Sequence, residues 1–96
     1  MVVVRQILGN ILAFVDILID AKQLDGAIIS LKQLPNLEEV YQVAGGGCNV
    51  VSIVSATDIE EFRDVLKNKI MKINGVRETM ASVSLASYKR SHSTLR

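Results

Sequence analysis

The chain has 96 residues, of which 49% are hydrophobic and 22% are charged, and its formal net charge at pH 7 is +1. This length allows one domain with its own core, and the apolar fraction excludes a disordered chain. A nearly balanced charge gives no electrostatic reason to expect nucleic-acid binding. The single cysteine, Cys48, excludes an internal disulfide and a cysteine-rich zinc site, which favours a reducing cytoplasm.

The first strongly apolar segment is residues 11–19, which Asp16 interrupts. It is far shorter than the roughly 20 apolar residues that a membrane span requires, so we expect a strand and no membrane partner. Apolar side chains alternate onto both faces of this strand, which predicts that both faces are covered. Residues 1–10, which contain the turn signal Gly9-Asn10, are predicted to form an extended N-terminal arm.

A first helix is predicted to begin at Asp20, with Gln23 completing a capping box. Its apolar stripe consists of Leu24, Ala27, Ile28 and Leu31, and Pro35 ends it. Residues 40–44 then read as a second strand, the glycines 45–47 as a turn, and residues 49–56 as a third strand.

A second helix is predicted to begin at a stronger capping box, formed by Thr57 and Glu60, with Asp58 complementing the helix dipole. About four turns follow, marked by Ile59, Phe62, Leu66, Ile70 and Ile73. Asn74-Gly75 closes this helix, residues 76–87 form a fourth strand, and residues 89–96 form a polar, flexible tail.

This element order, βαββαβ, predicts one α+β domain over residues 11–88. Residues 34–39 resemble residues 73–78, which supports two similar halves joined by the glycine turn. The expected fold is a ferredoxin-like sandwich: a four-stranded antiparallel sheet with both helices on one face, as in dimeric α+β barrel proteins.

Two helices cover only one face of such a sheet, yet the first and third strands are apolar on both faces. A second copy packed sheet to sheet would cover the other face and give a homodimer. The alternative is that the N-terminal arm folds back over this face, although so short an arm covers little of it.

The sequence offers few residues for catalysis. The only histidine, His92, lies in the tail, and no clustered ligands suggest a metal or another cofactor. Carboxylates around Asp58 fit a helix start, and no base lies near Cys48 in sequence to activate it. The glycines Gly45, Gly46 and Gly47 either expose backbone N–H groups to an anionic ligand or serve a hairpin turn alone. We therefore predict a binding domain and not an enzyme.

Several segments together resemble the C-terminal effector (RAM) domain of Lrp/AsnC (feast/famine) transcription regulators. The resemblance spans roughly residues 8–85. It rests on Leu8-Gly9 with residues 13–15, on Leu34-Pro35 with Val40-Tyr41-Gln42-Val43, and on Asp58, Ile59, Phe62, Leu66, Gly75-Val76-Arg77, Thr79, Val83 and Leu85.

This resemblance implies dimerisation through the sheets, assembly of four dimers into an octamer, and a small effector, typically an amino acid, bound between subunits. The residues it assigns to ligand binding are Gly45, Gly46, Gly47, Asn49 and Thr79. Full-length relatives carry an N-terminal helix-turn-helix, for which this chain has no room. The expectation is thus a stand-alone effector domain that modulates full-length regulators and does not itself bind nucleic acid.

The ligand loop departs from the family pattern of glycine, acid, aromatic and aspartate, because Gly47 and Cys48 occupy the acidic and aromatic positions. Two alternatives stay open beside the effector domain. One is a purely structural or partner-binding oligomer without a ligand, and the other is an enzyme of the dimeric α+β barrel type. In that enzyme Asp16 would be the only acid carried by a strand.

Overall fold

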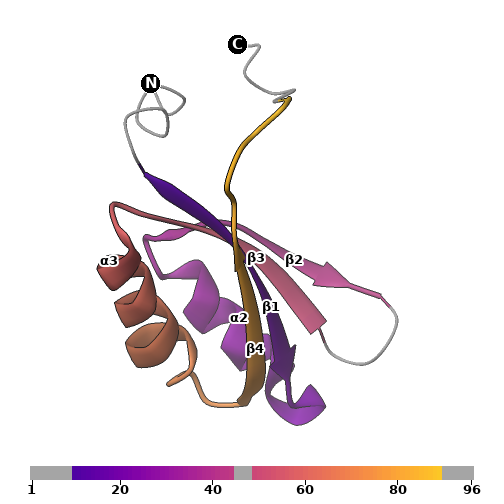
Figure 1. Ribbon diagram of the computed structural model, residues 1–96. Helices are drawn as coiled ribbons and strands as arrows, with labels where there is room; N and C mark the ends of the chain where they lie inside the picture. Colours follow the sequence, from indigo (N-terminus) through magenta and orange to yellow (C-terminus); the bar gives the residue numbers. More distant parts are fainter. Residues whose placement is uncertain (1–9, 45–48, 90–96) are drawn as a thin grey trace.

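The computed structural model describes residues 10–44 and 49–89. Its elements in chain order are β1 (Ile11–Ile19), the 3-10 turn η1 (Ala21–Gln23), α2 (Leu24–Lys32), β2 (Leu37–Val43), β3 (Asn49–Ala56), α3 (Ile59–Asp64), the π-helical segment η2 (Val65–Ile70) and β4 (Val76–Val83). The strands form one antiparallel sheet in the order β2-β3-β1-β4. Both helices lie on the same face of the sheet (Figure 1), which confirms the predicted ferredoxin-like fold.

The core lies between this sheet and the two helices. Strand β1 is central and contributes four buried side chains, Ala13, Val15, Ile17 and Ile19, all on its helix-covered face. The other main contributors are Val50 and Val54 of β3, Ala27 and Leu31 of α2, and Phe62, Val65 and Ile70 of α3 and η2. Alternate residues of β1 point away from the helices, as the pleat of a strand requires.

Strands β1 and β3 have the predicted bounds, whereas the edge strands β2 and β4 do not. Strand β2 begins at Leu37, three residues before its predicted start, because its pairing with β3 already begins there. Strand β4 ends at Val83 and not at Ser87. The Ser84 N–H donates a last hydrogen bond of 2.7 Å to the Leu12 carbonyl, one residue from the start of β1 at Ile11.

Asp20 caps the first helical segment as predicted, but the capping box with Gln23 does not form. The Asp20 carboxylate accepts a hydrogen bond from the Lys22 N–H at 3.3 Å. The Asp20 N–H donates instead to the Gly75 carbonyl at 2.8 Å, so the group that Gln23 would have satisfied already has a partner in the turn before β4. The Gln23 Oε1 atom is buried and has no hydrogen-bond partner within the described residues.

The capping box of α3 lies one residue later than predicted. Asp58 is the N-cap and its carboxylate accepts from the Glu61 N–H at 2.8 Å. The Glu61 carboxylate accepts in return from the N–H and the hydroxyl of Thr57, at 2.7 and 2.8 Å. Helix α3 then continues without a break into η2, which ends at Ile70, so Ile73 lies in the following turn and not in the predicted helix.

The internal repeat predicted from sequence corresponds to two turns with matching hydrogen bonds. In the first turn the Leu37 N–H donates to the Leu34 carbonyl, and in the second the Val76 N–H donates to the Ile73 carbonyl, both at 3.1 Å. Each turn leads from a helix on one face into an edge strand of the sheet. Gly75 in the second turn adopts φ +99°, which explains the glycine at that position.

Within the described residues, no helix is long and apolar enough to cross a membrane. The N-terminal arm (residues 1–10) and the C-terminal tail (residues 89–96) lie outside the described residues except for Asn10 and Lys89. The glycine turn 45–47, Cys48 and His92 also lie outside them.

Candidate ligand-binding pocket on the open sheet face

The sheet face opposite the helices, here called the open face, is rich in apolar side chains. It is formed by alternate strand residues: Leu12, Phe14, Asp16 and Leu18 of β1, Glu39, Tyr41 and Val43 of β2, Asn49, Val51, Ile53 and Ser55 of β3, and Glu78, Met80 and Ser82 of β4. No helix of the described chain covers it (Figure 1). Phe14 is 44% exposed and Met80 is 72% exposed, so large apolar groups at its centre face outward.

The strand pairing places three charged side chains on the open face, and all are acidic: Asp16, Glu39 and Glu78. Glu38, at the irregularity in β2, also reaches this face, because it accepts a hydrogen bond of 2.7 Å from the Ser55 hydroxyl. The one cation within a described strand is Arg77, which lies beside the irregular pairing of β1 with β4 and forms no ion pair with a described acid. The open face therefore combines apolar surface with negative charge.

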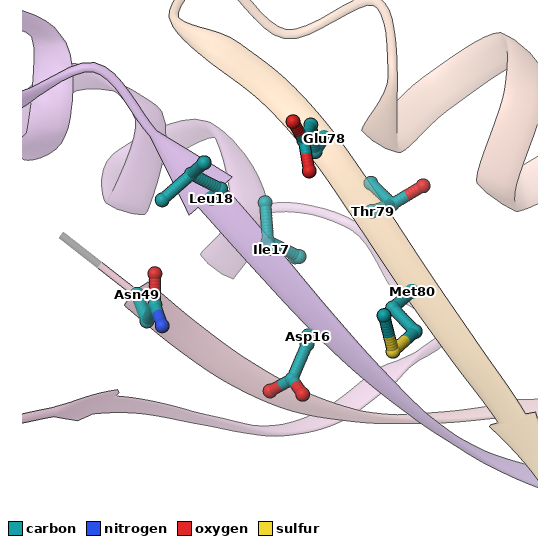
Figure 2. Close-up of a pocket in the computed structure, with 7 residues that line it drawn as sticks. All are labelled: Asp16, Ile17, Leu18, Asn49, Glu78, Thr79 and Met80. Atoms are coloured by element: carbon teal, nitrogen blue, oxygen red, sulfur yellow. The ribbon is translucent and has the colours of Figure 1, made fainter. Parts of the chain in front are cut away.

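A pocket of about 290 Å³ lies at one end of the open face. It is lined by residues 16–18 of β1, by Asn49 of β3 and by residues 78–80 of β4. Figure 2 shows these residues on three adjacent strands, with Leu18 between Asn49 and Glu78. The lining combines two carboxylates, an amide and a hydroxyl with the apolar side chains of Ile17, Leu18 and Met80.

Strand register explains how residues distant in sequence meet here. Leu18 is paired with Asn49 on one side and with Glu78 on the other, which gives a row across β3, β1 and β4. In the next row on the same face, Asp16 lies between Val51 and Met80. Side chains two residues apart on a strand share a face, so these two rows form one acidic and apolar surface.

Two of the five residues predicted to bind a ligand, Asn49 and Thr79, line this pocket. The alternation along β4 directs the Thr79 side chain to the opposite face from Glu78 and Met80, so Asn49 is better placed to contact a ligand. The Asn49 Oδ1 atom is buried and has no hydrogen-bond partner within the described residues. Gly45, Gly46 and Gly47 lie outside the described residues, and their part in binding stays a prediction.

Glu78 and Met80 were not predicted as pocket residues, and Asp16 was considered only as the lone strand-borne acid of an enzyme. That expectation was wrong, because β2 carries Glu38 and Glu39 and β4 carries Glu78. One signal was present for Asp16: a carboxylate in the middle of an otherwise apolar segment. No comparable signal marks Glu78, because an acid on an edge strand is ordinary. Its place in the pocket follows only from its pairing with Leu18.

Two further polar side chains of the open face, Tyr41 and Glu39, are paired with one another. The Tyr41 hydroxyl donates a hydrogen bond to the Glu39 carboxylate. This hydrogen bond, together with the negative charge of Glu39, raises the pKa of Tyr41. The phenol therefore remains a neutral donor at neutral pH. Within the described residues, no group of three or more histidine, cysteine or carboxylate side chains could hold a metal ion.

Residues 12–94 match the family model of the Lrp/AsnC ligand binding domain, which covers both helices and all of the sheet except Ile11. The chain belongs to this family. The resemblance found in the sequence is thereby confirmed. Among curated proteins, no match was found.

Solved structures agree with this assignment. The chain is similar to TTHA0845 from Thermus thermophilus, with 31% identity and a TM-score of 0.76 over 83% of this chain and 99% of that one. It also resembles AsnC from E. coli, with 24% identity and a TM-score of 0.80 over 92% of this chain and 60% of that one. A third is the transcriptional regulator NMB0573 of Neisseria meningitidis, solved as its L-Met complex, with 20% identity and a TM-score of 0.75 over 83% of this chain and 53% of that one. The chain thus spans little more than half of the two regulators.

Proposed function

We propose that this Lrp/AsnC ligand-binding domain binds a small effector between subunits, pairs with itself through the open face, and serves regulation in the cytoplasm and not catalysis. The observation that carries this proposal is the pocket of residues 16–18, 49 and 78–80, which lies on a sheet face that no described helix covers, in a member of a ligand-binding family. The single cysteine supports the cytoplasm, because the chain has no internal disulfide.

The open face, which no described helix covers, supports the homodimer. Soluble monomers seldom expose contiguous apolar patches larger than a few hundred Å², and the open face carries Phe14, Val51, Ile53 and Met80 on three neighbouring strands. A second copy packed sheet to sheet would bury the same side chains on both partners in a two-fold interface. Assembly of such dimers into an octamer and association with full-length regulators extend the same proposal.

Amino acids are the first ligands to test. The Neisseria meningitidis regulator, which has this fold, was solved with L-Met, and a pocket of about 290 Å³ is near the lower limit for small-molecule sites. Because the pocket lies on the open face, a second copy packed there would close it from the other side. The ligand would then contact residues of both copies.

The interface is tested by sedimentation equilibrium on the wild-type protein and on two variants. Phe14→Asp places a charge in the centre of the open face, and we expect it to give monomers at concentrations where the wild type is dimeric. Ile29→Asp is the matched control, because Ile29 is 56% exposed on α2, away from the open face. A wild-type protein that stays monomeric, or equal behaviour of both variants, would refute the sheet-to-sheet dimer.

Ligand binding is tested by a thermal-shift screen against the common amino acids and related metabolites. A ligand that binds only the folded state stabilises it by about 2.7 kcal/mol at a hundredfold excess over its Kd, which is a readily measured shift. We expect a shift confined to a few compounds and reduced in Asn49→Ala. No shift for any compound at millimolar concentration, in a protein that still dimerises, would favour a structural or partner-binding oligomer.

A further inference from the structure

The charged residues among those described as lining the pocket all have the same sign. Asp16 and Glu78 line it, and no lysine, arginine or histidine is among its lining residues. Neither carboxylate has an ion-pair or hydrogen-bond partner within the described residues.

A second copy would not change this sign. In the proposed sheet-to-sheet dimer, the partner's open face brings the same strand residues, whose charged members are acids. Two acidic surfaces then meet around the pocket, and their mutual repulsion falls when a cation lies between them. Both the pocket lining and the described open face around it therefore favour positive charge in the ligand.

The hydrogen-bonding groups agree with this preference. The two lining carboxylates, Asp16 and Glu78, can only accept hydrogen bonds when ionised. An ammonium group has three N–H donors and a positive charge, so it could satisfy acceptors of this kind together. Leu18 and Met80 provide apolar surface for a short alkyl chain beside it.

From these observations we infer that the pocket selects a small primary amine of net positive charge, whose carboxylate is absent or masked, over a free amino acid. This inference rests on the proposed function, because it names the chemical class of the ligand at the same site. A free amino acid also carries a carboxylate, which would lie near Asp16 and Glu78 without any lining cation to pair with it. An amide in its place removes that repulsion and keeps the ammonium.

The test compares L-methioninamide with L-methionine by isothermal titration calorimetry on the full chain. The two compounds have the same side chain and ammonium and differ only at the carboxylate. We expect the amide to bind at least about tenfold more tightly. Asp16→Asn and Glu78→Gln should each weaken binding of the amide, and added salt should weaken it in the wild type. Asp25→Asn, on the exposed surface of α2, removes the same charge away from the pocket and should leave the affinity unchanged.

Each outcome separates this inference from the proposed function. If L-methionine or another free amino acid binds as tightly as the amide, and Asp16→Asn and Glu78→Gln do not alter amide binding, the cation preference is wrong while the effector domain stands. If Asp25→Asn weakens the amide as much as Asp16→Asn does, the effect is one of net charge and the assignment to this pocket is wrong. If neither the amide, the amino acids nor simple alkylamines bind, both the inference and the proposed ligand fail.

Discussion

Asp16 of β1 is paired with Met80 of β4, so a carboxylate and an exposed thioether lie side by side on the open face. On its other side Asp16 faces Val51 of β3. The carboxylate is therefore flanked by apolar side chains on both neighbouring strands. In the proposed homodimer it would lie in an apolar interface together with the acids of the partner.

Asp16→Asn should consequently strengthen self-association. Removing one like charge from each copy lowers the repulsion between the two faces, and we expect the dimer Kd to fall roughly fivefold, equivalent to about 1 kcal/mol. Sedimentation equilibrium at low salt measures this change, and high salt should reduce the difference by screening. Asp25→Asn on α2 is the control for net charge. A weaker dimer in Asp16→Asn would show that the carboxylate makes a favourable contact across the interface.

The cap of α3 should make stability depend on acid pH. Hydrogen bonds from the Thr57 N–H, the Thr57 hydroxyl and Asn36 hold the pKa of Glu61 below its ordinary value. Because its pKa is lower in the folded than in the unfolded chain, Glu61 stabilises the fold above its unfolded pKa, and this contribution disappears as pH falls through the folded pKa.

Glu61→Gln should therefore be less stable than the wild type near neutral pH, and the difference should vanish in strong acid. Urea denaturation at several pH values between about 7 and about 2 measures this convergence. Glu60→Gln, on the same turn but outside the capping box, should show a much smaller difference at every pH. A constant difference between Glu61→Gln and wild type down to the lowest pH would contradict the role of the ionised carboxylate.

Replacing Gly75 and Gly26 by alanine should change the free energy of unfolding in opposite directions. A Cβ at Gly75 would lie 2.7 Å from the Gln23 Cβ atom, and φ there is +99°, so we expect Gly75→Ala to cost about 2–4 kcal/mol. A Cβ at Gly26, in α2, would meet nothing within 4 Å, and Gly26→Ala should stabilise by roughly 0.5–1 kcal/mol. Urea denaturation of both variants measures the two effects. A Gly75→Ala protein as stable as the wild type would mean that the turn relaxes around the new methyl group.

The sequence predicted the two central strands better than the two edge strands, for a physical reason. Strands β1 and β3 are apolar on both faces and bounded by turn or capping residues, so their own patterns set their bounds. Where β4 ends depends instead on where β1 begins, as the hydrogen bond from Ser84 to Leu12 shows. A dependence on a partner strand does not appear in the local sequence.

The capping box of α3 was displaced by one residue because two overlapping patterns are present. Thr57 with Glu60 and Asp58 with Glu61 both have the spacing of a capping box, and the backbone conformation of Asp58 decides between them. The pocket could be predicted from the sequence even less, because it is formed by residues that are distant along the chain. Asn49 was predicted, but the row of Glu78, Leu18 and Asn49 exists only through the pairing of three strands.

Substitutions on opposite sides of α2 should show how much more core packing contributes to stability than the exposed surface does. Leu31 is fully buried, whereas Ile29 is 56% exposed on the same helix. Leu31→Ala removes methyl groups from the packed core and should cost about 2–5 kcal/mol, since the cavity left behind closes only in part. Ile29→Ala loses little burial and gains helix propensity, so its effect should stay within about 0.5 kcal/mol. Because unfolding of a dimer depends on concentration, both variants are compared by urea denaturation at one protein concentration. A large loss in Ile29→Ala would reveal a second buried surface on the helix side, where higher assemblies of dimers would then have to form.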